Sequence, residues 1–281
     1  MLTITIDWLA GTFKEFNDDT ETFLRTYASA DDVLPIKPRN GYHIAQQDGN
    51  GVQFFWNSND NRMGYHVVFT GSSLRNLLER QAIPALTLLH AAINAGMRVS
   101  RLDLAKDLTG QEIDGEALYK FIKSGVNGGT ARNALRIENE KGGQTIYVGS
   151  RQSERYIRIY DKAQETGETS IKWWRMEIET KGDVARVVAA ALIDDAEPAA
   201  IFDTTIAKMV GAFTGSPFEQ FASRGVVSWG LPKIEKHTDR EKWIAEQVIS
   251  AVSEHFASNP DSEAVKALIA VLNHIQSHRS K

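Results

Sequence analysis

The chain of 281 residues contains no cysteine, so disulfide bonds and thiolate metal sites are excluded and nothing indicates an oxidising compartment. It also has no apolar run near the roughly 20 residues that a membrane-spanning helix requires. The opening segment, MLTITIDWLAGTF, has no basic stretch followed by an apolar core, so it does not have the pattern of a secretory signal. We therefore expect a cytoplasmic protein without a membrane partner.

Positive charge and histidine motifs are also scarce. The formal net charge is −4, from 32 Lys and Arg against 36 Asp and Glu, which argues weakly against a nucleic-acid partner. Between residues 132 and 162, however, seven cations accompany four acids, so a local basic strip remains possible. None of the seven histidines forms His-x-His or His-Glu-x-x-His, so histidine-based nickase and zinc-protease sites lack support.

The periodicity of apolar residues predicts strands and helices in alternating clusters. The predicted strands are residues 2–13, 51–58, 64–71, 98–107, 134–140, 143–150, 155–162 and 171–182. The predicted helices are residues 20–27, 72–83, 85–95, 114–125, 183–192, 238–256 and 262–278. This order indicates an α+β fold, in which an antiparallel sheet with flanking helices (residues 1–205) is followed by a mainly helical C-terminal region (residues 206–281).

One predicted strand, RYIRIYDKAQE at residues 155–165, carries an unusual set of polar residues. Successive side chains of a strand point to opposite faces, so Tyr156, Arg158, Tyr160 and Lys162 share one face while the intervening isoleucines face a core. A phenol among cations suits covalent attack on a phosphodiester. The same alternation is also typical of an ordinary amphipathic edge strand.

Two further predicted strands carry charged residues at alternate positions, and their apolar residues place all three polar faces on the same side of one sheet. The charged residues are Arg101, Asp103 and Asp107 in one strand and Arg175, Glu177 and Glu179 in the other, with Asp7 of the first strand as a further candidate. Carboxylates from adjacent strands suit Mg²⁺ or Mn²⁺, which prefer oxygen ligands. Alternating acids are also the usual solvent-exposed face of a strand, so spacing alone leaves both interpretations open.

Three blocks of the sequence together resemble one known family. SRLDLAKD, TIYVGSRQSERYIRIYDKAQE and WWRMEIETKGD resemble, in order and spacing, the replication initiation factor family. This family includes the Rep_trans-type initiators of rolling-circle plasmids, related phage initiators and some conjugative relaxases. The resemblance covers roughly residues 95–190, and its central block is the most specific part.

The resemblance implies a nicking-endonuclease-like fold and a metal-dependent enzyme that nicks one DNA strand at an origin and later rejoins it. Tyr160 corresponds to the nucleophile that holds the 5′ phosphate. Lys162 and Arg158 lie beside it in sequence and are expected to stabilise the phenolate or the scissile phosphate. The expected ligands of Mg²⁺ or Mn²⁺ are Asp103, Glu177, Glu179 and Asp107, with Asp7 added only because of its position in its strand. The candidate DNA contacts are Arg101, Arg151, Arg155 and Arg175, and for Arg101 and Arg175 the sequence leaves pairing with the acids open as the alternative.

The resemblance further implies a homodimer, a host helicase as partner, and a single-stranded or hairpin nick site within a double-strand origin. The C-terminal helices are then candidates for DNA recognition or dimerisation. Three alternatives stay open at this point. The first is a conjugative relaxase of the same family, the second is a non-catalytic DNA-binding regulator, and the third is a metal-dependent hydrolase in which Tyr160 is structural.

Overall fold

The computed structural model describes residues 4–29, 32–58, 61–125, 128–140, 142–168, 170–211 and 215–223, together with four single positions at 258, 262, 263 and 266. Its contacts divide the chain into two units, Met1–Pro232 and Lys233–Lys281. The helices and strands below belong to the first unit. The helix predicted for residues 238–256 lies outside the described residues, as does nearly all of the helix predicted for 262–278.

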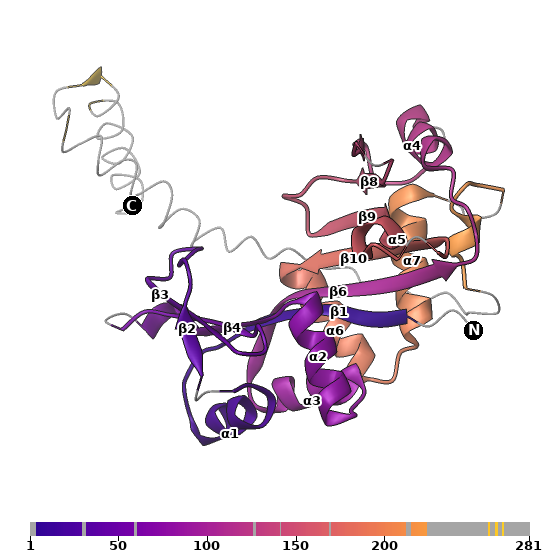
Figure 1. Cartoon of the computed structure of the whole chain (residues 1–281). Helices are drawn as coiled ribbons and strands as arrows, with labels where there is room; N and C mark the ends of the chain where they lie inside the picture. Colours follow the sequence, from indigo (N-terminus) through magenta and orange to yellow (C-terminus); the bar gives the residue numbers. More distant parts are fainter. Residues whose placement is uncertain are drawn as a thin grey trace. The chain divides into compact units, whose positions relative to one another are not determined.

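The described part of the first unit contains one antiparallel sheet of ten strands (Figure 1). The strands are β1 (Ile4–Phe13), β2 (Val33–Pro35), β3 (Ile44–Asp48), β4 (Gln53–Trp56), β5 (Tyr65–Phe69), β6 (Met97–Thr109), β7 (Ala134–Glu138), β8 (Gln144–Val148), β9 (Arg155–Asp161) and β10 (Trp173–Lys181). Their order across the sheet is β2-β3-β4-β5-β1-β6-β10-β9-β8-β7. The prediction of an α+β fold built on an antiparallel sheet is therefore confirmed.

Helices cover the sheet and build its core. The described helices are α1 (Asp18–Tyr27), α2 (Gly71–Gln81), α3 (Ala85–Asn94), α4 (Gly115–Ser124), α5 (Lys162–Thr166), α6 (Gly182–Ile193) and α7 (Pro198–Val210), with 3-10 turns at Asn61–Met63 and Glu219–Phe221. Helices α3 and α6 pack on β6, α7 on β1 and β10, and α4 on β7 and β8. Leu102, Leu104 and Leu108 alternate along β6 and are fully buried, so this face of the central strand belongs to the core. Among the residues described, no helix has both the length and the apolar character needed to cross a bilayer.

The structure differs from the predicted elements at the end of β9. The strand predicted to run through Lys162 ends at Asp161, whose side chain accepts a hydrogen bond from Gln164 N at 3.0 Å and thereby caps α5. Lys162 is therefore the first residue of a helix. Helix α7 continues across residue 205, where the sequence predicts a domain boundary, and the assignment of roles to the two regions stays a prediction.

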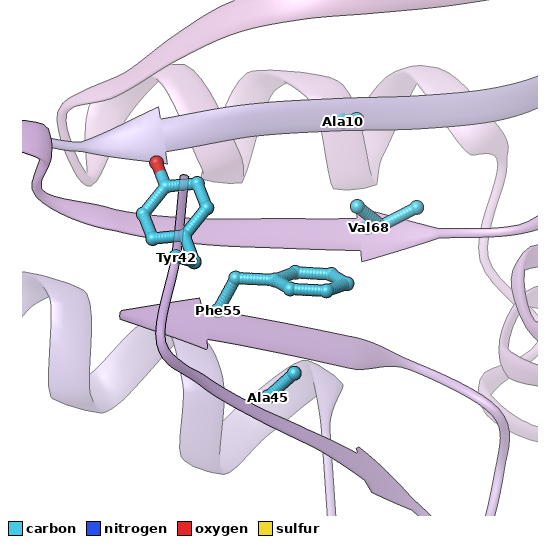
Figure 2. Close-up of a cluster of buried hydrophobic side chains, with 5 residues drawn as sticks. All are labelled: Ala10, Tyr42, Ala45, Phe55 and Val68. Atoms are coloured by element: carbon cyan, nitrogen blue, oxygen red, sulfur yellow. The ribbon is translucent and has the colours of Figure 1, made fainter. Parts of the chain in front are cut away.

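A cluster of buried hydrophobic side chains packs between β1 and the strands β3, β4 and β5 (Figure 2). It consists of Ala10, Tyr42, Ala45, Phe55 and Val68, with Trp8 and Ile36 packed against it. Ala10 lies opposite both Val68 on β5 and Arg101 on β6, and directly opposed residues point to the same face of a sheet. The Arg101 guanidinium in turn lies 4.2 Å from the ring centroid of Trp8. The cluster thus packs against the edge of the polar face described below.

Because His66 packs beside this cluster, we expect the free energy of unfolding to depend on pH. Its Nδ1 lies 2.9 Å from the Thr12 hydroxyl, and burial, reinforced by the positive charge of Arg39, lowers the pKa of His66 to about 4. Between pH 6.5 and 4 the unfolded chain therefore binds the extra proton, so the free energy of unfolding falls as the pH falls. We expect His66 to contribute a loss on the order of 2–3 kcal/mol across this interval.

This loss can be measured by urea unfolding of the wild type and of His66→Gln at pH 6.5 and at pH 4.5, followed by circular dichroism. The variant should lose less stability than the wild type between the two pH values. An equal loss in both proteins would show that His66 is not buried as a neutral imidazole.

Candidate active site

The register of the sheet brings the charged residues of three strands onto one face. Along β10, Arg175 lies opposite Asp107 of β6 and Tyr160 of β9, and Glu177 lies opposite Arg158. In the next row of the same face, Glu179 of β10 is flanked by Asp103 and Tyr156. The common polar face that the alternation predicts is therefore present.

A bulge in β1 adds two more residues to this face. The register of β1 against β6 shifts between Ile6 and Trp8, so Trp8 lies opposite Asp103 and Asp7 has no directly opposed partner. In a regular strand Asp7 and Trp8 would point to opposite faces, as the sequence predicts. The bulge instead lets both side chains line the same cavity.

Tyr160, Glu177 and Arg158 form one hydrogen-bonded group. The buried Tyr160 hydroxyl donates to Oε1 of Glu177 at 2.6 Å, and Arg158 donates to Oε2 of the same carboxylate, from Nε at 3.0 Å and from Nη2 at 2.5 Å. The Arg158 guanidinium also lies 4.7 Å from the Tyr160 ring centroid. Burial and the Glu177 charge raise the pKa of Tyr160 well above its ordinary value, which Arg158 only partly offsets. The phenol is therefore protonated at neutral pH, next to a carboxylate that can accept its proton.

Lys162 approaches Tyr160 from α5. Its Nζ lies 5.5 Å from the Tyr160 ring centroid and forms an ion pair with Glu165 one helical turn further on. Lys162 is 7% exposed, so solvent screens its charge little and the charge acts on the nearby phenol. The sequence predicts this proximity correctly, although it places Lys162 in the strand.

Arg101 holds two opposed carboxylates together. Its Nη2 lies 2.5 Å from Oδ2 of Asp103 and 2.7 Å from Oε2 of Glu179, and its Nε donates to Asp103 Oδ1 at 3.0 Å. Burial raises the pKa of Asp103 to about 7; the charges of Glu179 and Glu177 act in the same direction, and Arg101 offsets only part of the effect. A buried carboxyl with a raised pKa beside other acids is a common feature of functional sites.

Arg175 is the central ion of a second group. Its Nε and Nη2 donate to the two oxygens of Asp107 at 2.8 and 2.7 Å, and its Nη1 donates to Asp7 Oδ1 at 2.8 Å. Trp173 Nε1 donates to Asp107 as well, at 2.7 Å. Burial opposes the charge of Asp107, but these hydrogen bonds outweigh it and hold the pKa of Asp107 below its ordinary value. Arg175 is thus buried among its partners and pairs with the acids, which is one of the two roles that the sequence leaves open for it.

Two neighbouring cavities open on the polar face. The larger, about 360 Å³, is lined by Asp7, Trp8, Arg101, Asp103, Tyr147, Arg151, Tyr156, Arg158, Glu177, Glu179 and Lys181. The smaller, about 180 Å³, is lined by Tyr160 with Asn139, Gly143, Gln144, Thr145, Tyr147, Arg158, Asp161, Gln164 and Glu165. Tyr147 and Arg158 line both cavities, so they separate the candidate nucleophile from most of the carboxylates.

The structure does not bring every candidate together. Arg155 alternates with Tyr156 and shares the face of Ile157, and it lines neither cavity. Asp107 also lines neither, since Arg175 and Trp173 engage it. Trp8 and Lys181 line the larger cavity although the sequence does not single them out. The alternation of Arg175, Glu177 and Glu179 continues to Lys181 and could have identified it. The position of Trp8 on this face could not be predicted, because it depends on the bulge in β1.

The carboxylates of the polar face have the chemistry, but not the closed arrangement, of a divalent-cation site. Among the residues that the structure describes, no group of three or more acidic or histidine side chains is arranged to hold a metal ion. The donors nevertheless fit a hard cation, because all of them are carboxylate oxygens. Asp103 and Glu179 contact the same nitrogen of Arg101, so these two are the pair best placed to share a cation.

Comparison with known proteins identifies the class to which this fold and site belong. Residues 97–218, which include β6, β9 and β10, match the sequence profile of the family described as replication initiation factor. This region of the chain resembles the replication initiation factor family, as the three sequence blocks predict. Asp7 and Trp8 lie outside the matched region.

Two individual proteins are similar to the chain. In an alignment over 210 residues that covers 67% of the chain, it is 23% identical to the "Putative DNA relaxase NicK" of Bacillus subtilis (strain 168). The match spans 58% of that protein's length. The solved structure of a rolling circle replication initiator protein from Geobacillus stearothermophilus matches with a TM-score of 0.61 and 26% identity, covering 75% of this chain and 86% of that one.

Proposed function

We propose that the chain nicks one strand of DNA through Tyr160 and holds the 5′ phosphate on that residue, to initiate rolling-circle replication. The observation that supports this proposal is the 2.6 Å hydrogen bond from the Tyr160 hydroxyl to Glu177, on the polar face of the sheet. It sets a phenol beside a carboxylate that can act as general base. The match of residues 97–218 to the replication initiation factor family supports the same chemistry.

The proposed step is a transesterification at the scissile phosphate, and the leaving 3′ oxygen is protonated by solvent. The Tyr160 oxygen attacks phosphorus, its proton passes to Glu177, and the bond between phosphorus and the 3′ oxygen breaks. The departing 3′ oxygen takes up a proton and becomes a free hydroxyl. The phosphotyrosine conserves the bond energy, so religation by the reverse reaction needs no nucleotide cofactor. Arg158 and Lys162, close to the Tyr160 ring, stabilise the negative charge that develops.

A divalent cation, Mg²⁺ or Mn²⁺, is part of the proposal. Asp103 and Glu179 would hold it, with Asp7 and Glu177 lining the same cavity. The bound ion would supply positive charge that polarises a phosphate oxygen. It would compete with Arg101 for the same oxygens, because Arg101 contacts both carboxylates.

Replacement of Asp103 tests the cation site directly. We expect Asp103→Asn to weaken Mn²⁺ binding by about tenfold or more, because it removes a charged ligand. Isothermal titration of Mn²⁺ into the DNA-free protein measures this without reference to activity. Glu112→Gln, which removes an exposed carboxylate paired with Lys172, is the matched control and should bind Mn²⁺ as the wild type does. Equal affinities in Asp103→Asn and the wild type would remove Asp103 from the site.

The DNA substrate and the partners belong to the proposal as well. An unpaired strand, from a single-stranded region or an extruded hairpin, can reach a site recessed in cavities of the sheet face. The match to a putative DNA relaxase favours the initiation of conjugative transfer as the second candidate function. The chemistry is the same in both cases, so the DNA target distinguishes them. A homodimer and a host helicase remain predictions from the family.

A covalent-adduct assay tests the proposed function. The protein is incubated with Mn²⁺ and labelled oligonucleotides from its own replicon, both single-stranded and blunt duplex. We expect an SDS-stable protein–DNA species with the single-stranded DNA that EDTA prevents. Binding without an adduct on any of these oligonucleotides would instead support a non-catalytic regulator. Cleavage without an adduct would support a hydrolase in which Tyr160 is structural.

A further inference from the structure

An aromatic pair and an arginine lie beside the candidate nucleophile. The rings of Tyr147 on β8 and Tyr156 on β9 are stacked, with centroids 5.7 Å apart and planes inclined by 18°. The Arg151 guanidinium lies 5.3 Å from the Tyr147 centroid and 6.0 Å from that of Tyr156. None of these three side chains takes part in the proton transfer proposed for Tyr160.

The turn between β8 and β9 holds Arg151 over the rings. Gly149 opens this turn with a φ of +94°, and a Cβ there would lie 3.2 Å from Met209 Cε and 3.4 Å from the Arg155 carbonyl. Lys181 Nζ donates to the Arg151 carbonyl at 2.7 Å and fixes the turn from β10. The Arg151 side chain itself is exposed, so its position over Tyr147 is on the open side of the sheet.

The stack lies next to the cavity that Tyr160 lines. Tyr147 lines both the cavity that contains Tyr160 and the larger cavity that contains the carboxylates. On the neighbouring edge strand β7, Leu135 lies directly opposite Tyr147 and is 56% exposed. An aromatic ring, a cation and an exposed apolar side chain therefore form one continuous surface next to the nucleophile.

We propose that Tyr147, Tyr156 and Arg151 form a stacking subsite for one unpaired nucleobase of the scissile strand. Aromatic rings and guanidinium planes bind bases through their π-faces, and they do so with little dependence on sequence. The subsite takes the base next to the phosphate that Tyr160 attacks and thereby fixes the strand relative to the nucleophile. This inference rests on the proposed nicking function, because it is the position of Tyr160 that places the scissile phosphate.

Fluorescence anisotropy with two probes tests the subsite: a labelled single-stranded dT oligonucleotide and an abasic oligonucleotide of the same length. We expect Tyr147→Leu to weaken binding of the dT probe by roughly tenfold, and Tyr147→Phe to retain it, because stacking needs only the ring. The abasic probe, which keeps the phosphates, should bind the wild type and Tyr147→Leu equally. Tyr119→Leu on α4, a residue that lines neither cavity, is the control for loss of a tyrosine.

A second variant keeps the test valid if Tyr147→Leu does not fold. Arg151→Gln changes an exposed side chain, and we expect it to weaken binding of the dT probe as well. Unchanged affinity of both variants for the dT probe, or equal losses on the dT and abasic probes, would overturn the subsite. The proposed nicking function fails by a different observation, namely the absence of an adduct in the wild type.

Discussion

Tyr160→Phe is expected to abolish the covalent protein–DNA adduct and to leave the fold intact. Phenylalanine keeps the buried ring and removes only the oxygen, whose hydrogen bond goes to Glu177. The chemistry has no substitute for this oxygen, so adduct formation should fall on the order of a thousandfold or more. The measurement compares SDS-stable adduct on labelled single-stranded DNA in Mn²⁺ for both proteins, with thermal melting as the check on folding.

The other tyrosines of the polar face define the outcome that would contradict this expectation. If Tyr160→Phe still forms the adduct, the nucleophile is Tyr156 or Tyr147, both of which line the larger cavity with the carboxylates. Loss of the adduct in Tyr156→Phe or in Tyr147→Phe then identifies which of the two it is. The matched control is Tyr119→Phe on α4, which removes a phenol that lines neither cavity and should form adduct at the wild-type rate.

The central part of the fold is predictable because one face of the sheet is buried and the other carries polar residues. In β10 this produces strict alternation, whereas in β6 the alternation is interrupted by Ala105 and by Lys106, which is fully buried on the face of Leu104. The two strands pair in the register that the alternation suggests. Helices α2 and α3 are separated at Pro84, and α4 begins after the N-cap Asp114, so local sequence also predicts these boundaries.

Elements without such local signals are not predictable. The residues of β3, IAQQD, show no clear alternation, and the strand exists because it pairs with β2 and β4. Its end is fixed by the buried Asp48, whose carboxylate accepts hydrogen bonds from Asn50 N at 2.9 Å and Val52 N at 2.8 Å. A turn acceptor of this kind cannot be distinguished in sequence from a solvent-exposed aspartate.

The candidate site, too, is predictable where it depends on local alternation and unpredictable where it depends on how the strands pair. Alternation predicts that Tyr160, Glu177 and Asp103 share a face, and it also places Arg155 with Ile157 on the opposite face, contrary to its expected contact with DNA. The β1 bulge is invisible in the sequence, because it depends on how β1 pairs with β6. The pairing of each carboxylate with a particular arginine depends on side-chain directions across strands, which periodicity does not give.

Arg175→Met is expected to destabilise the folded protein strongly. Arg175 is 6% exposed and neutralises both Asp7 and Asp107. Methionine fills most of the volume but leaves two carboxylates without their cation. Removing one partner of a buried ion pair typically lowers the free energy of unfolding by about 3–5 kcal/mol. Urea unfolding at neutral pH, followed by circular dichroism, measures this loss.

The matched control is Arg25→Met, which breaks the exposed Arg25–Glu21 pair of α1 at 2.7 Å and should cost less than about 1 kcal/mol. Adding Asp7→Asn and Asp107→Asn to Arg175→Met should restore part of the stability, because the stranded charges are then absent. If Arg175→Met lowers the free energy of unfolding no more than Arg25→Met does, the ion pairs of Arg175 with Asp7 and Asp107 are solvated in solution. Arg175 would then be accessible to DNA, which is the other role that the sequence leaves open for it, and would not be the buried centre of the sheet's polar face.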